Sequence, residues 1–334
     1  MNRFDFNPSI HSTPAMQHFD VFNGDADGLC ALQQLRLAEP RDSILVTGPK
    51  REIDLLGRVP SGAAGSVTVL DVSMEKNRAA LDRLLAEGVS VTYFDHHFPG
   101  EIPSHSALST HIETLPDKGT SLLVDDYLAG RHRAWAVVGT FGDNFDRAAR
   151  RAAEPLALGA EAIEQLRQLG ILLNYNGYGA KVEDLHYAPD DLFGRLRPYA
   201  DPLDFVAEDA AFRALLDGYQ SDMAEVGSLR PAVEDDAHRL FILPAEPWAR
   251  RASGVFANDL AQQEPGRAHA ILTRLADASF LVSVRAPIAR PTGADDLCRQ
   301  FATGGGRKAA AGINRLPEAD YDRFVDAFQA AFRS

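Results

Sequence analysis

The sequence predicts an α/β fold in which a domain built on a parallel sheet is followed by a smaller α/β domain. In the first half, short β-branched runs alternate with helical stretches, which implies βαβ crossovers and a parallel sheet. A second alternation follows an acidic, proline-containing stretch. The 334 residues are 45% hydrophobic and 24% charged, which excludes a mainly disordered, collagen-like or coiled-coil protein.

The first domain is expected to extend over residues 1–200. Its expected strands are residues 19–22, 43–47, 66–72 and 89–94, its expected helices are residues 28–38 and 74–87, and residues 134–168 form an alanine-rich helical region with a break at 139–144. In the helix at 74–87, the leucines at 81, 84 and 85 share one face, which is typical of an amphipathic helix.

A connecting helix and linker are expected at residues 201–235, and a smaller second domain at 236–334. Residues 181–218 carry nine acidic against four basic side chains and three prolines, which is typical of a solvated connection. In the second domain we expect strands at 239–244 and 278–285, a helix between them at 253–263, a glycine run at 304–306 and a terminal helix at 318–332.

The charge balance limits the partners that the chain can have. It holds 34 Lys and Arg against 47 Asp and Glu, a formal charge of −13. Proteins that grip long duplexes are usually basic, so any nucleic-acid substrate should be short or bound by a locally basic site. Two cysteines, Cys30 and Cys298, favour a reducing compartment. Residues 1–14 lack the apolar core of a signal peptide, and we expect a cytoplasmic protein with no membrane partner.

Two carboxylates follow the first expected strand, in the segment Asn-Gly-Asp-Ala-Asp-Gly at 23–28. Asp25 and Asp27 would cost stability there unless a cation neutralised them. The alternative is a solvated turn that caps the next helix. A calcium loop is rejected, because its twelfth position would be Gln34 instead of a bidentate glutamate and a strand leads into it.

Later strand ends add further donors. Asp71 ends an apolar strand, where it either binds a cation or caps a helix that begins near Ser73. The adjacent histidines of the segment Phe-Asp-His-His-Phe at 94–98 lie between apolar neighbours and need hydrogen-bond or metal partners. Asp143 follows an apolar stretch, and its alternative role is to end a helix.

Together these residues predict a metal site. The carboxyl ends of successive strands would bring together four carboxylates and a histidine, at the edge where open parallel sheets place functional side chains. Oxygen and imidazole ligands suit Mn²⁺ or Mg²⁺, and the lack of thiolates argues against structural zinc. Four negative charges would be balanced by two divalent ions, an arrangement that serves phosphoester hydrolysis.

The motifs resemble those of the DHH phosphoesterase family, of the RecJ-like and nanoRNase-like kind. The similarity rests on Asp-Ala-Asp-Gly at 25–28, the strand end at Asp71, Asp-His-His at 95–97 and Gly-Asp at 142–143. The second half is similar to the DHHA1 substrate domain of that family, through Ser-Val-Arg at 283–285 and the glycine-rich run at 304–312. The resemblance implies an active site in the cleft between the two domains.

The resemblance also implies roles for individual residues. The implied metal ligands are Asp25, Asp27, Asp71, His96 and Asp143, with Asp71 shared by the two ions. Asp95 would orient the histidines, and His97 would contact the scissile phosphate or the leaving group. The implied substrate-binding residues are Arg285, Gly304, Gly305, Gly306, Arg307 and Lys308.

The glycine run is expected to offer backbone N–H groups to a phosphate and to enter a helix directly afterwards; the alternative is a mobile turn with solvated basic neighbours. Phe141 and the segment Tyr175–Tyr178 are candidates for stacking on bases. Two positions depart from the family pattern. Val21 stands where some relatives carry a further histidine ligand, and Arg307 stands where the glycine motif continues with histidine.

The expected function is that of a Mn²⁺-dependent phosphodiesterase or exonuclease that degrades short RNA or single-stranded DNA oligonucleotides to 5′-mononucleotides. Family members that act on cyclic or linear dinucleotides, or on 3′-phosphoadenosine 5′-phosphate, provide an alternative. A different class of function is a catalytically silent nucleotide-binding module, against which the intact ligand set argues. A homodimer is a possible assembly.

Overall fold

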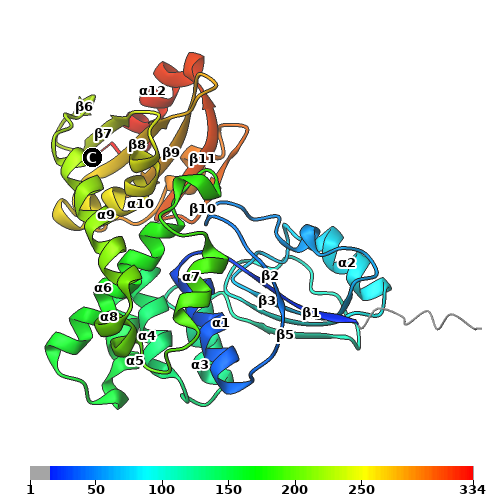
Figure 1. Ribbon diagram of the computed structural model, residues 1–334. Helices are drawn as coiled ribbons and strands as arrows, with labels where there is room; N and C mark the ends of the chain where they lie inside the picture. Colours follow the sequence, from blue (N-terminus) through cyan, green and yellow to red (C-terminus); the bar gives the residue numbers. More distant parts are fainter. Residues whose placement is uncertain (1–15, 334) are drawn as a thin grey trace, which may run out of the picture.

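The computed structural model describes residues 16–333, so the segment 1–14 lies outside the described residues. The first part of the chain is built on a parallel sheet, as expected (Figure 1). Its strands are β1 (Gln17–Phe22), β2 (Ile44–Val46), β3 (Ala64–Leu70), β4 (Ser90–Asp95) and β5 (Leu108–Ile112). They pair in the order β2-β1-β3-β4-β5. β5, at one edge, was not expected from the sequence.

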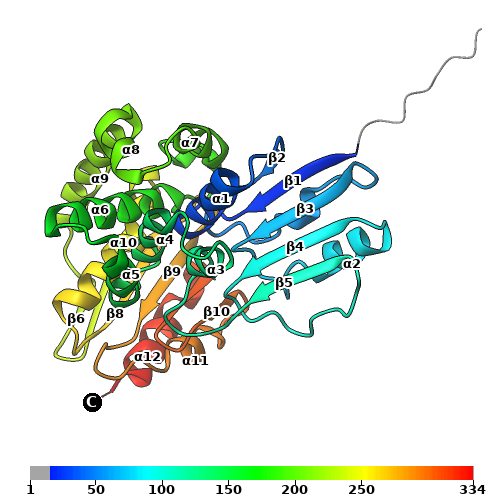
Figure 2. The same ribbon diagram turned by 90° about the horizontal axis from the view of Figure 1, so that it is seen from below.

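Helices lie on both faces of this sheet and in a further layer that packs on those helices. The helices of the first part are α1 (Ala26–Ala38), α2 (Arg78–Ala86), α3 (Thr120–Tyr127), α4 (Arg133–Gly142), α5 (Asp146–Ala153), α6 (Ala160–Gly177), α7 (Pro189–Leu196), α8 (Pro202–Glu208) and α9 (Ala210–Gly227). The leucines of α2 pack on the face that carries Phe19 and Val21. The opposite face packs against α1, behind which α4 and α6 lie (Figure 2).

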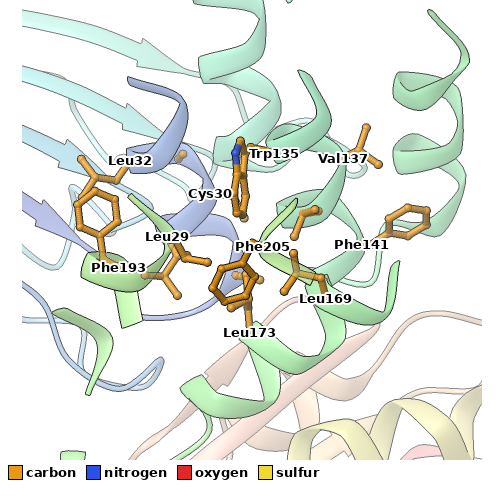
Figure 3. Close-up of a cluster of buried hydrophobic side chains, with 14 of the residues drawn as sticks. Leu29, Cys30, Leu32, Trp135, Val137, Phe141, Leu169, Leu173, Phe193 and Phe205 are labelled. Carbon is orange, nitrogen blue, oxygen red and sulfur yellow. The ribbon is translucent and has the colours of Figure 1, made fainter. Parts of the chain in front are cut away.

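The main core therefore lies between helices as much as against the sheet. Figure 3 shows its centre, where Leu29 and Leu32 of α1 meet Trp135 of α4 and Leu169 and Leu173 of α6. All five side chains are fully buried. Burial of side chains of this size contributes roughly 1.5–3 kcal/mol each, so this helical layer fixes α1, whose N-terminus carries Asp25 and Asp27.

The second part of the chain is a mixed sheet. Its strands are β6 (Val233–Glu234), β7 (His238–Leu243), β8 (Ala268–Arg274), β9 (Ser279–Arg285), β10 (Gly304–Gly306) and β11 (Ala310–Pro317), in the order β10-β11-β9-β8-β7-β6. Only β7 and β8 are parallel neighbours. α10 (Pro247–Gln263) packs on one face, and α11 (Ala294–Cys298) and α12 (Tyr321–Ala331) pack on the other.

The structure departs from the expected elements at several places. α2 begins at Arg78, four residues later than expected, and α6 continues to Gly177, well beyond residue 168. The strand β8 was missed altogether. The glycine run forms β10 and turns into β11 instead of entering a helix, so that expectation is wrong. None of the helices between residues 16 and 333 has the length and apolar character that crossing a bilayer requires.

Polar side chains join the two parts. Arg51, which follows β2, donates to Ser283 Oγ of β9 at 2.9 Å. On α10, Arg250 forms a salt bridge with Asp184, and Arg251 donates to Asp222 of α9 and to the carbonyl oxygen of Asp184. These contacts set the spacing between the carboxyl edge of the parallel sheet and the second sheet.

Candidate metal centre and interdomain cleft

The N-terminus of α1 positions Asp25 and Asp27. Asp25 caps the helix, because its Oδ1 accepts the N–H groups of Asp27 and Gly28 at 3.1 Å each. Capping was the alternative role expected for Asp25, and Asp25 performs it. It also belongs to the acidic cluster, which consists of Asp25, Asp27, Asp71 and Asp143 with His96. Asp27 is fully buried and accepts the N–H groups of Thr120 and Ser121 at 2.6 and 2.8 Å. The N-terminus of α3 thus fixes this carboxylate.

Asp71 lies one residue beyond β3 and has a left-handed backbone with φ of 57°. It does not cap a helix, since α2 begins at Arg78 after the N-cap residue Asn77. Its Oδ1 lies 3.3 Å from His96 Nε2 and accepts the hydroxyl of Thr120 at 3.2 Å. The helix-capping alternative for Asp71 is therefore wrong.

The end of β4 supplies Asp95, His96 and His97. Asp95 is fully buried, and its Oδ1 lies 2.7 Å from His97 Nδ1. The other oxygen of Asp95 has no hydrogen-bond partner among the described residues. The side chain of His96 is 7% exposed, whereas that of His97 is 47% exposed and lines a cavity. Asp95 thus holds the ring of His97 at the mouth of the cluster.

Asp143 reaches the cluster from a helix. It follows α4 as the C-cap residue, with its N–H bonded to the carbonyl oxygen of Gly139 at 3.0 Å. Its Oδ2 lies 3.6 Å from His96 Nε2. The expectation that all four carboxylates follow strands is wrong for Asp143, because the packing of α4 behind α1 brings the end of a helix to this edge.

Val21 takes no part in the site. Its side chain is fully buried in the cluster between the sheet and α2. The position that holds a histidine ligand in some relatives is therefore an apolar core position in this chain, and any ion must be held by the remaining donors.

The charges of the cluster act strongly on one another. Burial and the charge of Asp143 raise the pKa of Asp27 to about 6. Burial and the charge of Asp25 raise the pKa of Asp71 well above its usual value. Burial disfavours protonation of His96, but its hydrogen bond to Asp71 and the nearby carboxylates outweigh burial and raise the pKa of His96 to about 10. The cluster therefore attracts positive charge.

The donor set fits a divalent cation. Ligand atoms of Asp71, His96 and His97 lie within 4.8 Å of one another, and so do those of Asp27, His96 and Asp143. Carboxylate oxygens with one or two imidazoles are ligands that Mn²⁺ and Mg²⁺ accept. A bound cation would also relieve the mutual repulsion that raises the pKa values of Asp27 and Asp71.

The position of Lys50 in the acidic cluster was not predicted from the sequence. It follows β2, forms a salt bridge with Asp25, and lies 3.2 Å from Asp143 Oδ1 and 3.0 Å from Asn174 Oδ1. Burial would lower the pKa of Lys50, but the charges of Asp25 and Asp143 outweigh it and raise the pKa well above its usual value. No local pattern around Lys50 signals this contact, which depends on how the loop after β2 folds back.

Two cavities meet at the acidic cluster. The smaller, of about 340 Å³, is bordered by Asp25, Asp71, His96 and Asp143 of the acidic cluster, together with Ile53, Lys76, His97 and Gly306. The larger, of about 640 Å³, extends along the second sheet. Lys50, Asp143, Arg307 and Ala310 border both cavities. Together they form a cleft with the acidic cluster at its junction.

Some of the expected substrate-binding residues border this cleft, and others do not. Arg285, Arg307 and Lys308 border the larger cavity, and Gly306 borders the smaller one. Gly304 and Gly305 are not among the bordering residues. Gly304 is required for packing instead, because a Cβ atom there would lie 1.7 Å from the carbonyl oxygen of Cys298. Gly306 has φ of 139°, which few other residues adopt.

The aromatic residues of the cleft are only partly those expected. Phe141 and Tyr175 are buried, and the hydroxyl of Tyr175 contacts His186 and Asp222, so neither is available to a base. Tyr178 does border the larger cavity. Phe145, which was not singled out, borders it too and lies 5.6 Å from the guanidinium of Arg307.

Comparison with solved structures identifies the fold. An exonuclease RecJ bound to manganese matches with a TM-score of 0.63 and 21% identity, over 94% of this chain and 89% of its own. RecJ from Thermus thermophilus in complex with Mn²⁺ matches with a TM-score of 0.66 and 21% identity, over 94% of this chain but only 52% of its own. The chain has the fold of the RecJ-like DHH phosphoesterases.

A third solved structure is also similar in fold. PggH from Vibrio cholerae, a pGpG-specific phosphodiesterase, matches with a TM-score of 0.50 and 13% identity, over 95% of this chain and 100% of its own. No family model and no curated protein matches the sequence. The DHH resemblance read from the motifs is therefore confirmed by the fold.

Proposed function

We propose that the chain is a divalent-metal-dependent phosphodiesterase that hydrolyses short RNA or single-stranded DNA oligonucleotides to 5′-mononucleotides. The supporting observation is that the acidic cluster opens into the same cleft as Arg285, Arg307 and Lys308. None of these three cations forms a salt bridge with another side chain between residues 16 and 333. Unpaired cations beside a metal-binding cluster suit a substrate that carries several phosphates.

Asp25, Asp27, Asp71, His96 and Asp143 are the proposed metal ligands, and Mn²⁺ is the proposed ion, with two ions in the active state. When bound, the ions would lower the pKa of a water molecule and balance the charge of the transferring phosphoryl group. Thr120 and Ser121 hold Asp27 in place through their N–H groups. This support keeps the carboxylate oriented without further reorganisation.

His97 is the proposed proton donor to the leaving oxygen. Its Nδ1–H donates to Asp95, which leaves Nε2 available for a substrate oxygen, and His97 borders the smaller cavity. Burial opposes protonation of His97, but the hydrogen bond and charge of Asp95 outweigh burial and raise the pKa of His97. A raised pKa favours the protonated imidazole that a general acid requires.

The second domain would bind the remainder of the substrate. Arg285 and Arg307 can each contact a phosphate in a bidentate manner, and Lys308 adds a point charge. Phe145 and Tyr178 offer aromatic surfaces for a base. Since the cleft volume falls within the range of small-ligand sites, short substrates are favoured over long strands.

Hydrolysis of a linear dinucleotide is the second candidate function. The limited size of the cleft favours it, and one structural neighbour that spans the same length is specific for pGpG. Cyclic dinucleotides and 3′-phosphoadenosine 5′-phosphate remain alternatives for the same chemistry. The cytoplasmic location and the homodimer stay predictions.

A substrate panel with Mn²⁺ tests this function. The panel holds 3′-phosphoadenosine 5′-phosphate, pGpG, cyclic dinucleotides and oligonucleotides of 2 to 24 residues, with products separated by chromatography. We expect 5′-mononucleotides from the shortest oligonucleotides, little product from the longest, and no product in EDTA. Absence of turnover over a wide range of Mn²⁺ concentrations would overturn the proposal in favour of a silent nucleotide-binding module.

A further inference from the structure

Lys50 is built into the acidic cluster by both its backbone and its side chain. Its backbone N–H donates to the carbonyl oxygen of Gly177 at 2.9 Å, and its own carbonyl oxygen accepts from Asn23 Nδ2 at 3.3 Å. Its ammonium contacts Asp25 and lies 3.2 Å from Asp143 Oδ1 and 3.0 Å from Asn174 Oδ1. Three oxygen atoms thus surround one positive charge, in the way that ligands surround a small cation.

This contact uses the carboxylate atom that Asp25 would offer to a metal. Oδ1 of Asp25 caps α1, and Oδ2 pairs with Lys50. Among residues 16–333, ligand atoms converge in two groups, and Asp25 belongs to neither. Both groups depend on His96, whose Nε2 lies 3.3 Å from Asp71 and 3.6 Å from Asp143. One imidazole nitrogen binds one ion, so His96 Nε2 can serve only one of the two groups at a time, which favours a single tight ion in the free chain.

The charge balance leads to the same conclusion. Asp25, Asp27, Asp71 and Asp143 carry four negative charges, of which Lys50 offsets one. One divalent ion leaves the cluster with a charge of −1, whereas two ions in the presence of Lys50 would make it positive and buried, which is costly.

We propose that Lys50 competes with the second divalent ion, so that the free chain holds one ion tightly and gains the second only when the Lys50 ammonium leaves Asp25. The part of this inference that concerns substrate rests on the proposed function. Lys50 borders both cavities, so a substrate phosphate in the cleft can take its ammonium away from the carboxylates. The second ion would then bind together with the substrate and not before it.

Mn²⁺ titration of the metal-free chain, followed by electron paramagnetic resonance of the free ion, tests the competition without substrate. We expect one tight site in the natural chain and in Lys50→Arg, which keeps the charge. Lys50→Met keeps a similar length without the charge, and we expect two sites, with the Kd of the second lowered at least about tenfold. Lys76→Met is the matched control, since Lys76 borders the smaller cavity and is exposed; one site is expected.

Two tight sites in the natural chain, or one site in Lys50→Met, would overturn the inference. Asp25→Asn provides a test that does not require the Lys50 variant to fold, because Asn also caps helices well. We expect Asp25→Asn to retain the single tight ion, and loss of that ion would contradict the inference. Adding a phosphorothioate dinucleotide to the natural chain should raise the count to two, and an unchanged count would overturn the link to substrate.

These results are separate from those of the substrate panel. The number of bound ions is measured without turnover, so a chain that shows the expected stoichiometry but hydrolyses nothing contradicts the proposed function alone. A chain that hydrolyses short oligonucleotides but binds two ions in the free state contradicts this inference alone.

Discussion

Asp71 combines an unusual backbone with a buried charge. Its φ of 57° lies in the left-handed region, which Asp and Asn adopt more readily than other residues with a side chain. In this conformation its carboxylate lies 3.3 Å from His96 Nε2 and is 3% exposed. Strained residues cluster at functional sites because the surrounding structure holds them in place, which supports the proposed role of Asp71 in metal binding.

Asp71→Asn should separate catalysis from folding. Asparagine keeps the left-handed backbone and removes the charge, so we expect hydrolysis to fall at least about 100-fold. In EDTA the Tm should be unchanged or higher, because a buried carboxylate with a raised pKa is replaced by a neutral group. Asp236→Asn, at an exposed position, is the control for both measurements. Near-normal hydrolysis by Asp71→Asn would contradict the proposed role.

Arg307→Ala should act mainly on substrate binding. Arg307 borders both cavities and replaces the histidine of the family motif. We expect KM for a short oligonucleotide to rise about tenfold with kcat little changed, because a phosphate contact present in the ground state is lost. Arg307→Lys should recover part of the loss. If steady-state kinetics show a fall in kcat alone, Arg307 stabilises the transition state instead.

At the residue scale, site residues that lie in a recognisable motif could be predicted from the sequence. Site residues that reach the cluster only through tertiary packing could not. Asp25, Asp27, Asp71 and His96 stand in recognisable motifs and do converge. Lys50 and Asn174 reach the cluster from a loop and a helix whose neighbouring residues carry no signal. Their role depends on tertiary packing alone, and no reading of local sequence predicts it.

At the scale of elements, β1 and α1 are joined by a buried ion pair. Arg36 Nε donates to Asp20 Oδ2 at 2.8 Å, and both side chains are almost completely buried. His18 and Ser43 contact the same carboxylate. The pair fixes the strand that leads to Asp25 against the helix that follows it.

Asp20→Asn should weaken the fold in a pH-dependent way. Burial alone would raise the pKa of Asp20, but hydrogen bonds from His18 and Arg36 outweigh it and lower the pKa from 3.8 to about 2. The unfolded chain therefore binds the proton more tightly, so the stabilisation is complete above about pH 4 and disappears as the pH falls through 2. We expect urea unfolding to show a loss of stability at pH 7 that exceeds the loss at pH 2 by about 2 kcal/mol.

The difference in stability between the natural chain and Asp20→Asn isolates the contribution of Asp20. The other acidic side chains titrate in both proteins, so their contributions to the stability cancel. A loss of stability that is the same at both pH values would contradict the lowered pKa of Asp20.

The strands that were predicted are short apolar runs next to polar turns or helices with a clear apolar face. β3 and β4 contain β-branched residues and reach an acidic residue at or directly after their ends, and β1 ends in the apolar residues Val21 and Phe22, which is typical of strands in a parallel sheet. β8 is buried on both faces, between α10 and the helices α11 and α12, and therefore shows no alternation. Short apolar runs of this kind cannot be distinguished from helix by period alone. The short edge strand β5 gives an equally weak signal.

At the scale of the whole molecule, the two parts are joined next to the cleft. Arg251 of α10 donates to Asp222 of α9 at 2.8 Å and to the hydroxyl of Tyr175 of α6 at 3.2 Å. The side chains of Arg251 and Asp222 are 12% and 7% exposed. Such charge-assisted bonds fix the position of the second sheet over the acidic cluster.

Arg251→Met should reduce the efficiency of substrates that need both parts. We expect kcat/KM for a dinucleotide to fall about tenfold, because Arg285 and Arg307 are less precisely placed over the cluster. Hydrolysis of bis(p-nitrophenyl) phosphate, which needs the acidic cluster alone, should change little. Parallel loss of both activities would indicate damage to the first domain and contradict this role, as would full retention of both.

The metal centre itself is tested most directly by anomalous diffraction. Crystals of the chain grown with Mn²⁺ and a phosphorothioate dinucleotide would be measured on both sides of the manganese absorption edge. We predict manganese in contact with Asp25, Asp27, Asp71, His96 and Asp143, and a phosphate between this cluster and Arg307. Manganese bound elsewhere with these side chains unliganded, or a dinucleotide outside the cleft, would contradict this prediction.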